Sequence, residues 1–102
     1  ILQIDDNMLP DQFALHQNYP NPFNPSTTIR YDIAQESRVL IQVFDIQGRL
    51  VKTLVEKMDT PGKKSIHWNA TNQIGDPVSA GMYLYIIQTD SFNDTKKMLL
   101  LK

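Results

Sequence analysis

The residues of this chain that could do chemistry are few and lie far apart. His16 and His67 are fifty-one positions apart, and neither has an acidic residue or a cysteine at the spacing of a metal site. The chain has no cysteine, and no Gly-x-Ser-x-Gly, His-Glu-x-x-His or glycine-rich phosphate loop. Four of the eleven acidic residues stand singly in turn-forming stretches: Asp45, Asp59, Asp76 and Asp90. We therefore predict that the domain is not an enzyme and uses no metal or cofactor.

Two groups of residues suggest a ligand more directly. Asn69, Asn72 and Asp76 offer the hard oxygens that Ca²⁺ prefers, but they include one carboxylate and lack the alternating ligands of a binding loop. Trp68, Tyr83 and Tyr85 could form a platform that stacks on sugars, although Tyr and Trp at alternate strand positions are more typical of a core. The first group favours a turn. The second leaves a carbohydrate-binding or adhesive immunoglobulin-like module of a secreted enzyme as the alternative function.

The elements that must position these residues belong to one small domain of 102 residues. Its 41% hydrophobic and 21% charged residues are ordinary globular values, which excludes a disordered tail, a collagen-like rod and a disulfide-stapled miniprotein. A net charge of −1 gives no electrostatic reason to bind nucleic acid or an anionic membrane, and no apolar run is long enough to span a bilayer. The chain begins with Ile1, so we expect a piece of something longer. Residues 1–12 are acidic and contain a proline, and they are predicted to be a linker or the end of an upstream cargo region.

Alternating apolar residues from position 13 onward predict seven strands and no helix. Asp45 and Gly48 suit a type I turn in a hairpin, and Thr60-Pro61-Gly62 suits a type II turn. The spacing is typical of an all-β, immunoglobulin-like antiparallel sandwich, with a small barrel as the alternative. The last two strands are apolar on both faces, which predicts central or doubly covered positions. The predicted strands are Phe13–Gln17, Thr27–Ile33, Val39–Ile46, Leu50–Glu56, Lys63–Asn69, Gly81–Thr89 and Phe92–Lys102.

Two segments carry more constraint than a simple connection or strand needs. QNYPNPFNPS, at 17–26, has three prolines that restrict their own φ angles and their neighbours, and Tyr19 and Phe23 could pack it onto the sandwich. TKKMLLLK, at 95–102, is an apolar strand with lysines at both ends. A receptor could recognise such an end by strand addition or by its terminal carboxylate.

Several segments in order resemble the type A C-terminal sorting domain of the type IX secretion system, the Por secretion tail of Bacteroidetes and related phyla. They are LHQNYPNPFNPSTTIRYDI, VLIQVFDIQGRLVKTL, GKKSIHWNATNQIGDPVSAGMYLYII and KKMLLLK. A similar pattern occurs in the immunoglobulin-like part of flagellar hook-capping proteins, so a purely structural sandwich is a third reading. The resemblance covers about residues 13–102.

The resemblance implies a non-catalytic β-sandwich at the carboxyl end of exported cargo. Cargo would enter the periplasm by an amino-terminal signal peptide and cross the outer membrane through the type IX translocon. A sortase-like cysteine peptidase would then remove the domain, leaving the cargo at the cell surface or outside the cell. The expected unit is residues 13–102, with processing near 1–12.

Carried over by position, the resemblance assigns the family's motifs to particular residues. After Trp68 the family often has Asp-Gly, whereas this chain has Asn69-Ala70, and Ala70 tolerates positive φ poorly. We therefore expect a different turn there. The candidate translocon contacts are Lys96, Lys97, Met98, Leu100 and Lys102, and the structural motif residues are Pro20, Asn21, Pro22, Asp45, Gly48, Arg49, Gly81 and Tyr83.

Overall fold

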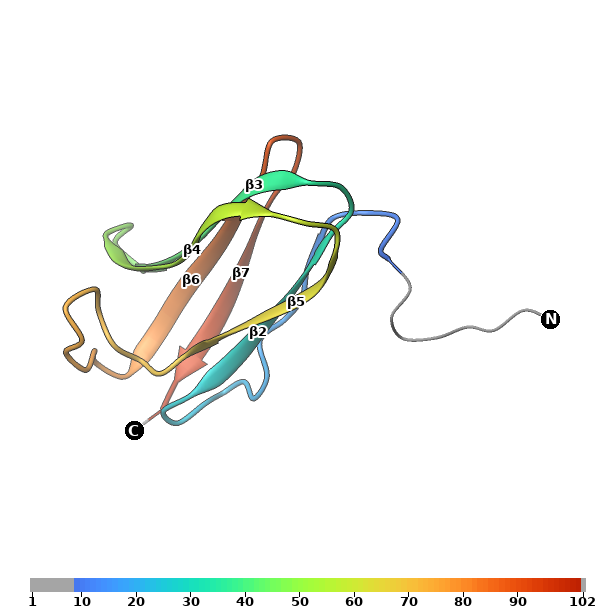
Figure 1. The fold of residues 1–102 in the computed structure, drawn as a ribbon. Helices are drawn as coiled ribbons and strands as arrows, with labels where there is room; N and C mark the ends of the chain where they lie inside the picture. The colour runs from blue at the N-terminus through green and yellow to red at the C-terminus, as the bar shows by residue number, and fades with distance from the viewer. Residues whose placement is uncertain (1–8, 102) are drawn as a thin grey trace.

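A computed structural model describes residues 9–101 of the chain, which form two antiparallel β-sheets and no helix (Figure 1). Residues 9–101 thus contain no helix that could cross a membrane. One sheet has the order β1-β2-β5 and the other has the order β4-β3-β6-β7. The strands are β1 (Ala14–Leu15), β2 (Thr27–Ile33), β3 (Ser37–Asp45), β4 (Leu50–Asp59), β5 (Gly62–Trp68), β6 (Gly81–Gln88) and β7 (Asn93–Leu100).

The alternation of side chains explains why the two sheets pack face to face. In β2 every second residue from Thr27 to Ile33 is buried, and β3 follows the same rule from Ser37 to Val43. Since successive side chains of a strand point to opposite faces, each sheet has one apolar face to bury. The core lies between these faces, so the all-β sandwich is confirmed and the barrel is not formed. Its largest fully buried side chains include Trp68, Tyr85, Phe23, Ile29, Ile33 and Ile41.

One predicted turn is confirmed and the other is wrong. The N–H of Gly48 donates to the carbonyl of Asp45 at 3.0 Å, closing the hairpin between β3 and β4, and Gly48 has a φ of 85°. At Gly62 the φ is 154°, far from the value near +80° of a type II turn. The reason is topological: β4 and β5 belong to different sheets, so Pro61 lies where the chain crosses between sheets.

The position of the last strand differs from the prediction. Strand β6 is central, but β7 is the outer strand of its sheet. The inward side chains Met98 and Leu100 of β7 are buried in the core, and the backbone edge at its end is hydrogen-bonded by a neighbouring segment that is not a strand. That segment follows the short β1 and returns the chain to β2 in the same sheet. We call residues 17–25 the proline corner.

Candidate functional site

The proline corner closes the edge of β7 with four hydrogen bonds. Gln17 Nε2 donates to the carbonyl of Lys97 at 2.7 Å, and Asn21 Oδ1 accepts from the N–H of Leu99 at 3.0 Å. Phe23 donates its N–H to the carbonyl of Leu99 and accepts from the N–H of Leu101, at 3.0 and 2.9 Å. The outward backbone groups from the carbonyl of Lys97 to the N–H of Leu101 therefore have partners. A receptor could add a strand along this stretch only by displacing the proline corner.

A buried network holds the proline corner against the sandwich. Asn18 donates its backbone N–H to the Tyr85 hydroxyl at 2.8 Å, and that hydroxyl donates to the carbonyl of His16 at 2.7 Å. Asn18 Nδ2 donates to Thr27 Oγ1 at 2.9 Å. Burial raises the pKa of Tyr85 to about 12, against the opposing effect of its hydrogen bond with Asn18. Phe23 packs on Trp68 in the core, whereas Tyr19 is 75% exposed, so Phe23 packs as predicted and Tyr19 does not.

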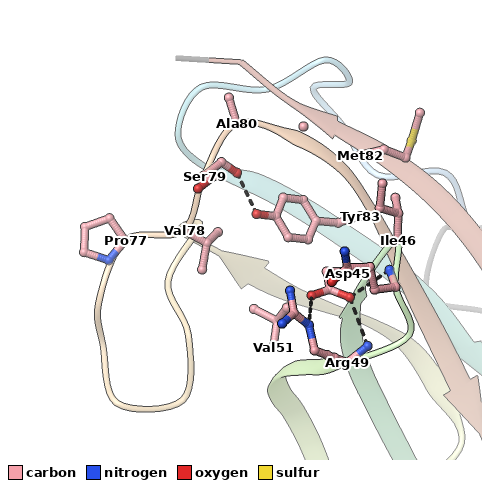
Figure 2. Close-up of a pocket in the computed structure, with 12 residues that line it drawn as sticks. Asp45, Ile46, Arg49, Val51, Pro77, Val78, Ser79, Ala80, Met82 and Tyr83 are labelled. Carbon is pink, nitrogen blue, oxygen red and sulfur yellow. Dashed lines mark hydrogen bonds and ion pairs between the residues drawn. The ribbon is translucent and has the colours of Figure 1, made fainter.

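The hairpin turn at Asp45 and Arg49 forms one wall of a groove of about 430 Å³ at the end of the sandwich (Figure 2). Asp45 accepts from the N–H groups of Gln47 and Arg49 and from Arg49 Nε, each at 2.9 Å. The Arg49 N–H is the largest cause of a pKa of Asp45 below its usual value. All of these bonds satisfy the turn itself. They leave the Arg49 side chain exposed at the rim.

The opposite wall of the groove comes from the residues before and at the start of β6. Tyr83 pairs with Asp45 across the two strands, and its hydroxyl donates to the carbonyl of Ser79 at 2.6 Å (Figure 2). Burial raises the pKa of Tyr83, and the charge of Asp45 adds to the shift. Gly81 begins β6 with a φ of 143°. The turn motif and the Gly-x-Tyr motif, separated in the sequence, thus meet in one groove.

The candidate contacts at the carboxyl end have different environments. Lys97 is exposed, and Lys96 is half-buried beside Asp94, with 3.8 Å between Nζ and Oδ2. Met98 and Leu100 are core side chains with 1% exposure each, so they stabilise β7 and do not present a surface. Lys102 lies outside the described residues.

Apolar side chains are exposed beside this end of β7. Met82 pairs with Leu99, and Ile46 and Met82 both line the groove of Figure 2. The exposed fractions are 71% for Ile46, 41% for Met82 and 47% for Leu101. With Arg49 and Lys97, these three residues form what we call the carboxyl-end surface, which is apolar with cationic flanks. Figure 2 shows Met82 pointing away from the core.

The residues that suggested other chemistry are engaged elsewhere. His16 Nε2 lies 3.2 Å from Asp32 Oδ2, and His67 Nδ1 lies 2.8 Å from Thr28 Oγ1, so the two histidines contact different partners on the outer face of one sheet. In residues 9–101 no three metal-ligating side chains gather at one point. Trp68, Tyr83 and Tyr85 are buried, with exposures of 6% or less, so the sugar-stacking platform is not formed.

The loop after β5 is a turn, as its residues indicated. Asn72 Oδ1 accepts from the N–H groups of Ile74 and Asp76, at 3.2 and 2.9 Å, which is how an Asn initiates a turn. Ala70, however, does adopt a positive φ of 61°. It is buried, and its carbonyl accepts from the N–H of Val78, so the surrounding packing imposes the conformation that the residue type disfavours.

Sequence reasoning did not assign a role to Gln17 or Asn18. Asn18 is one of three asparagines in the proline corner, and only the fold buries it while Asn21 and Asn24 stay exposed. The partner of Gln17 is eighty residues away. Neither position has a local signal that would identify it.

Comparison with known proteins places these features in a wider context. The sequence pattern described as a secretion system C-terminal sorting domain, the Por secretion tail, matches residues 17–101. No curated protein matches the chain. Two solved structures from Porphyromonas gingivalis share the fold. Dimeric latent PorU is 24% identical with a TM-score of 0.69 over 83% of this chain, and PorZ, a type IX secretion component, is 21% identical with a TM-score of 0.60 over 90%. The alignments cover 9% and 12% of those chains, so this chain corresponds to about a tenth of their length.

Proposed function

The chain belongs to the family of secretion system C-terminal sorting domains, the Por secretion tails of the type IX system, and we propose that it is a passive address label for cargo attached to its amino-terminal side. A sorting domain of this family is a non-catalytic secretion signal that directs export to the cell surface or beyond. The observation that carries the proposal is the family match over residues 17–101, which include the proline corner and β7.

We propose the finer steps of export by analogy with the same family. We take residues 13–102 as the folded label and 1–12 as the linker to the cargo. The label would be recognised in the periplasm by the outer-membrane translocon, and a sortase-like peptidase would cut near the linker. Proteases act on accessible chain, and Leu9 and Gln12 are exposed in the described part of this segment. Asp11 is exposed, in agreement with this placement.

The surface that the translocon reads is proposed to be the carboxyl-end surface together with the terminal lysines. Lys97 is exposed there, while Met98 and Leu100 contribute by anchoring β7. An exposed lysine can contact the translocon although its side chain does not pack in the core. Charge and packing can therefore be separated experimentally.

The test is export of a reporter enzyme that carries an amino-terminal signal peptide and this chain at its carboxyl end, in a bacterium with a type IX system. Replacing Lys96, Lys97 and Lys102 with Ala is expected to lower the fraction of reporter outside the cell several-fold, since each exposed ionic contact contributes about 0.2–1 kcal/mol. Replacing Arg30, Arg38 and Lys57 with Ala removes the same charge elsewhere and is the matched control.

Full export of the Lys96, Lys97 and Lys102 variant would mean that these lysines only solubilise the strand. Export that survives deletion of residues 96–102 would contradict the sorting role itself, because that deletion also removes Met98 and Leu100 from the core. Circular dichroism of each variant distinguishes loss of recognition from loss of folding.

A further inference from the structure

The outer strands of the two sheets differ in whether their free backbone edges are covered or irregular. The proline corner closes the edge of β7 from the carbonyl of Lys97 onward, and at the edge of β4 the N–H of Thr53 donates to Gln73 Oε1 at 2.8 Å. Strand β4 also has register shifts against β3, which disturb its edge. Natural sheets use such caps and irregularities to prevent association with other strands. Strand β5 has neither device.

The backbone of β5 presents a continuous open edge. All seven of its residues pair with β2 without a register shift. Thr28 exchanges hydrogen bonds with Tyr19, and the carbonyl of Arg30 accepts from His16, so the even-numbered residues of β2 bond toward β1. The odd-numbered residues of β2 therefore bond toward β5, and their partners there are even-numbered.

It follows that Lys63, Ser65 and His67 point their backbone N–H and C=O groups outward. Within residues 9–101 these groups have no hydrogen-bond partner. In Figure 1, β5 lies beside β2 with no strand on its other side in the same sheet. Three successive donor and acceptor sets at a straight edge are a template for an added strand.

The side chains along this edge indicate what the added strand should contain. On the outer face, Lys63, Ser65 and His67 are exposed, and Lys63 has no ion pair in the described part of the chain. Its cross-strand neighbour Asp32 contacts His16 instead. On the core side, Ile66 is partly buried against the core. A partner strand would thus place acidic side chains beside Lys63 and apolar side chains beside Ile66.

A second copy of this chain fits the edge poorly. Antiparallel pairing of two β5 strands centred on Ser65 would set Lys63 of each copy opposite His67 of the other. No acidic residue would then face Lys63. Opposite charges across strands contribute stability, and this pairing would supply none beside Lys63.

We propose that the edge of β5 is a strand-addition site for an extended peptide in which acidic and apolar residues alternate. Backbone hydrogen bonds to Lys63, Ser65 and His67 provide the affinity, and Lys63 selects an acidic partner. The site is separate from the carboxyl-end surface, and it does not depend on the role of the chain in secretion.

The test uses the whole chain and a capped peptide, Val-Glu-Val-Thr-Val-Glu-Val, with a control peptide that has Lys in place of both Glu. Binding of the Glu peptide is expected to shift the amide resonances of Lys63, Ser65 and His67 and to slow their hydrogen exchange. The Lys peptide should bind several-fold more weakly, because a like charge replaces an opposite one across the strands.

Two variants locate the site. Ser65→Pro removes an outward N–H, which an edge strand tolerates, and should abolish peptide binding while the amides of β6 stay protected. Lys63→Glu should weaken the Glu peptide several-fold and strengthen the Lys peptide, even if Ser65→Pro proves unstable. Equal affinity for both peptides, shifts confined to Thr53 or Leu99, or a dimer that disappears with Ser65→Pro would overturn the proposal.

Discussion

At the residue scale, the Tyr85 hydroxyl joins the proline corner to β6 by contacting two backbone groups at once. It accepts from the N–H of Asn18 and donates to the carbonyl of His16, and its side chain is fully buried. Buried polar groups that lose a partner cost free energy, because water cannot replace it. Tyr85 therefore contributes as a hydrogen-bonding residue as well as a core side chain.

Replacing Tyr85 with Phe keeps the ring and removes both bonds. We expect the free energy of unfolding to fall by about 1–3 kcal/mol, measured by urea denaturation at pH 7. Ile87 is the next inward-facing residue of β6. Ile87→Val removes one methylene from the core and is a control for packing alone, with an expected fall in the free energy of unfolding of about 0.5–1.5 kcal/mol. A Tyr85→Phe variant as stable as the parent would contradict the role of the hydroxyl.

The same substitution has a pH signature. The pKa of Tyr85 is about 12 in the folded chain and near 10 when unfolded, so the unfolded state releases this proton first. Its contribution to stability is therefore fully present below pH 10 and is lost as the pH rises toward 12. The Phe variant should lose stability less steeply over that interval.

At the element scale, β7 is an edge strand whose carboxyl end has backbone hydrogen bonds on both sides, as an inner strand has. Strand β6 bonds one side of it, and the proline corner bonds the other side from Lys97 to Leu101. The corner therefore stabilises the end of the strand against fraying. Its three prolines limit the freedom that the segment would otherwise lose on folding.

Asn21→Ala removes the side-chain acceptor of the Leu99 N–H. We expect hydrogen exchange at Leu99 and Leu101 to accelerate roughly fivefold, equivalent to about 1 kcal/mol of local stability, while the amides of β3 are unchanged. Asn24→Ala is the matched control, since Asn24 is exposed in the same corner and its side chain has no hydrogen-bond partner within residues 9–101. Equal exchange rates in the two variants would show that Asn21 does not secure β7.

At the scale of the whole molecule, the two ends of the four-stranded sheet differ in the number of exposed apolar side chains that lie together. At one end lie the groove, the end of β7 and the carboxyl-end surface. At the other end Met58 is 56% exposed and pairs with Arg38. Several exposed apolar side chains together, as in the carboxyl-end surface, are typical of an interaction site, whereas a single exposed methionine is ordinary.

Met82→Glu places a charge in the carboxyl-end surface, and Met58→Glu places the same charge at the opposite end. Both side chains are exposed, so each variant should change the free energy of unfolding by less than about 0.5 kcal/mol. In the reporter assay, we expect Met82→Glu to reduce export several-fold and Met58→Glu to leave it unchanged. Equal export of the two variants would exclude the carboxyl-end surface as the recognised surface.

Particular residues show which parts of the fold could be predicted from the sequence alone. The alternation of Thr27–Ile33 predicts β2 with its observed bounds, and Asp45 with Gly48 predicts the hairpin, because both signals are local. The motif residues came instead from the resemblance to the family, and the family match over 17–101 confirms that resemblance. The edge position of β7 and the crossing at Pro61 were not predictable, since strand order depends on which distant segments pair.

The amino-acid sequence by itself therefore determined seven strands in order, because periodicity and turn chemistry act over a few residues. The resemblance of its motifs identified the family. Only the tertiary structure decided which groups are exposed. It buried Met98 and Leu100, placed Asn21 on the backbone of β7, brought Tyr83 to Asp45 and left β5 open. The physical reason is that an edge, a groove or a cap exists only between segments far apart in the chain, and packing of the whole core selects which segments meet.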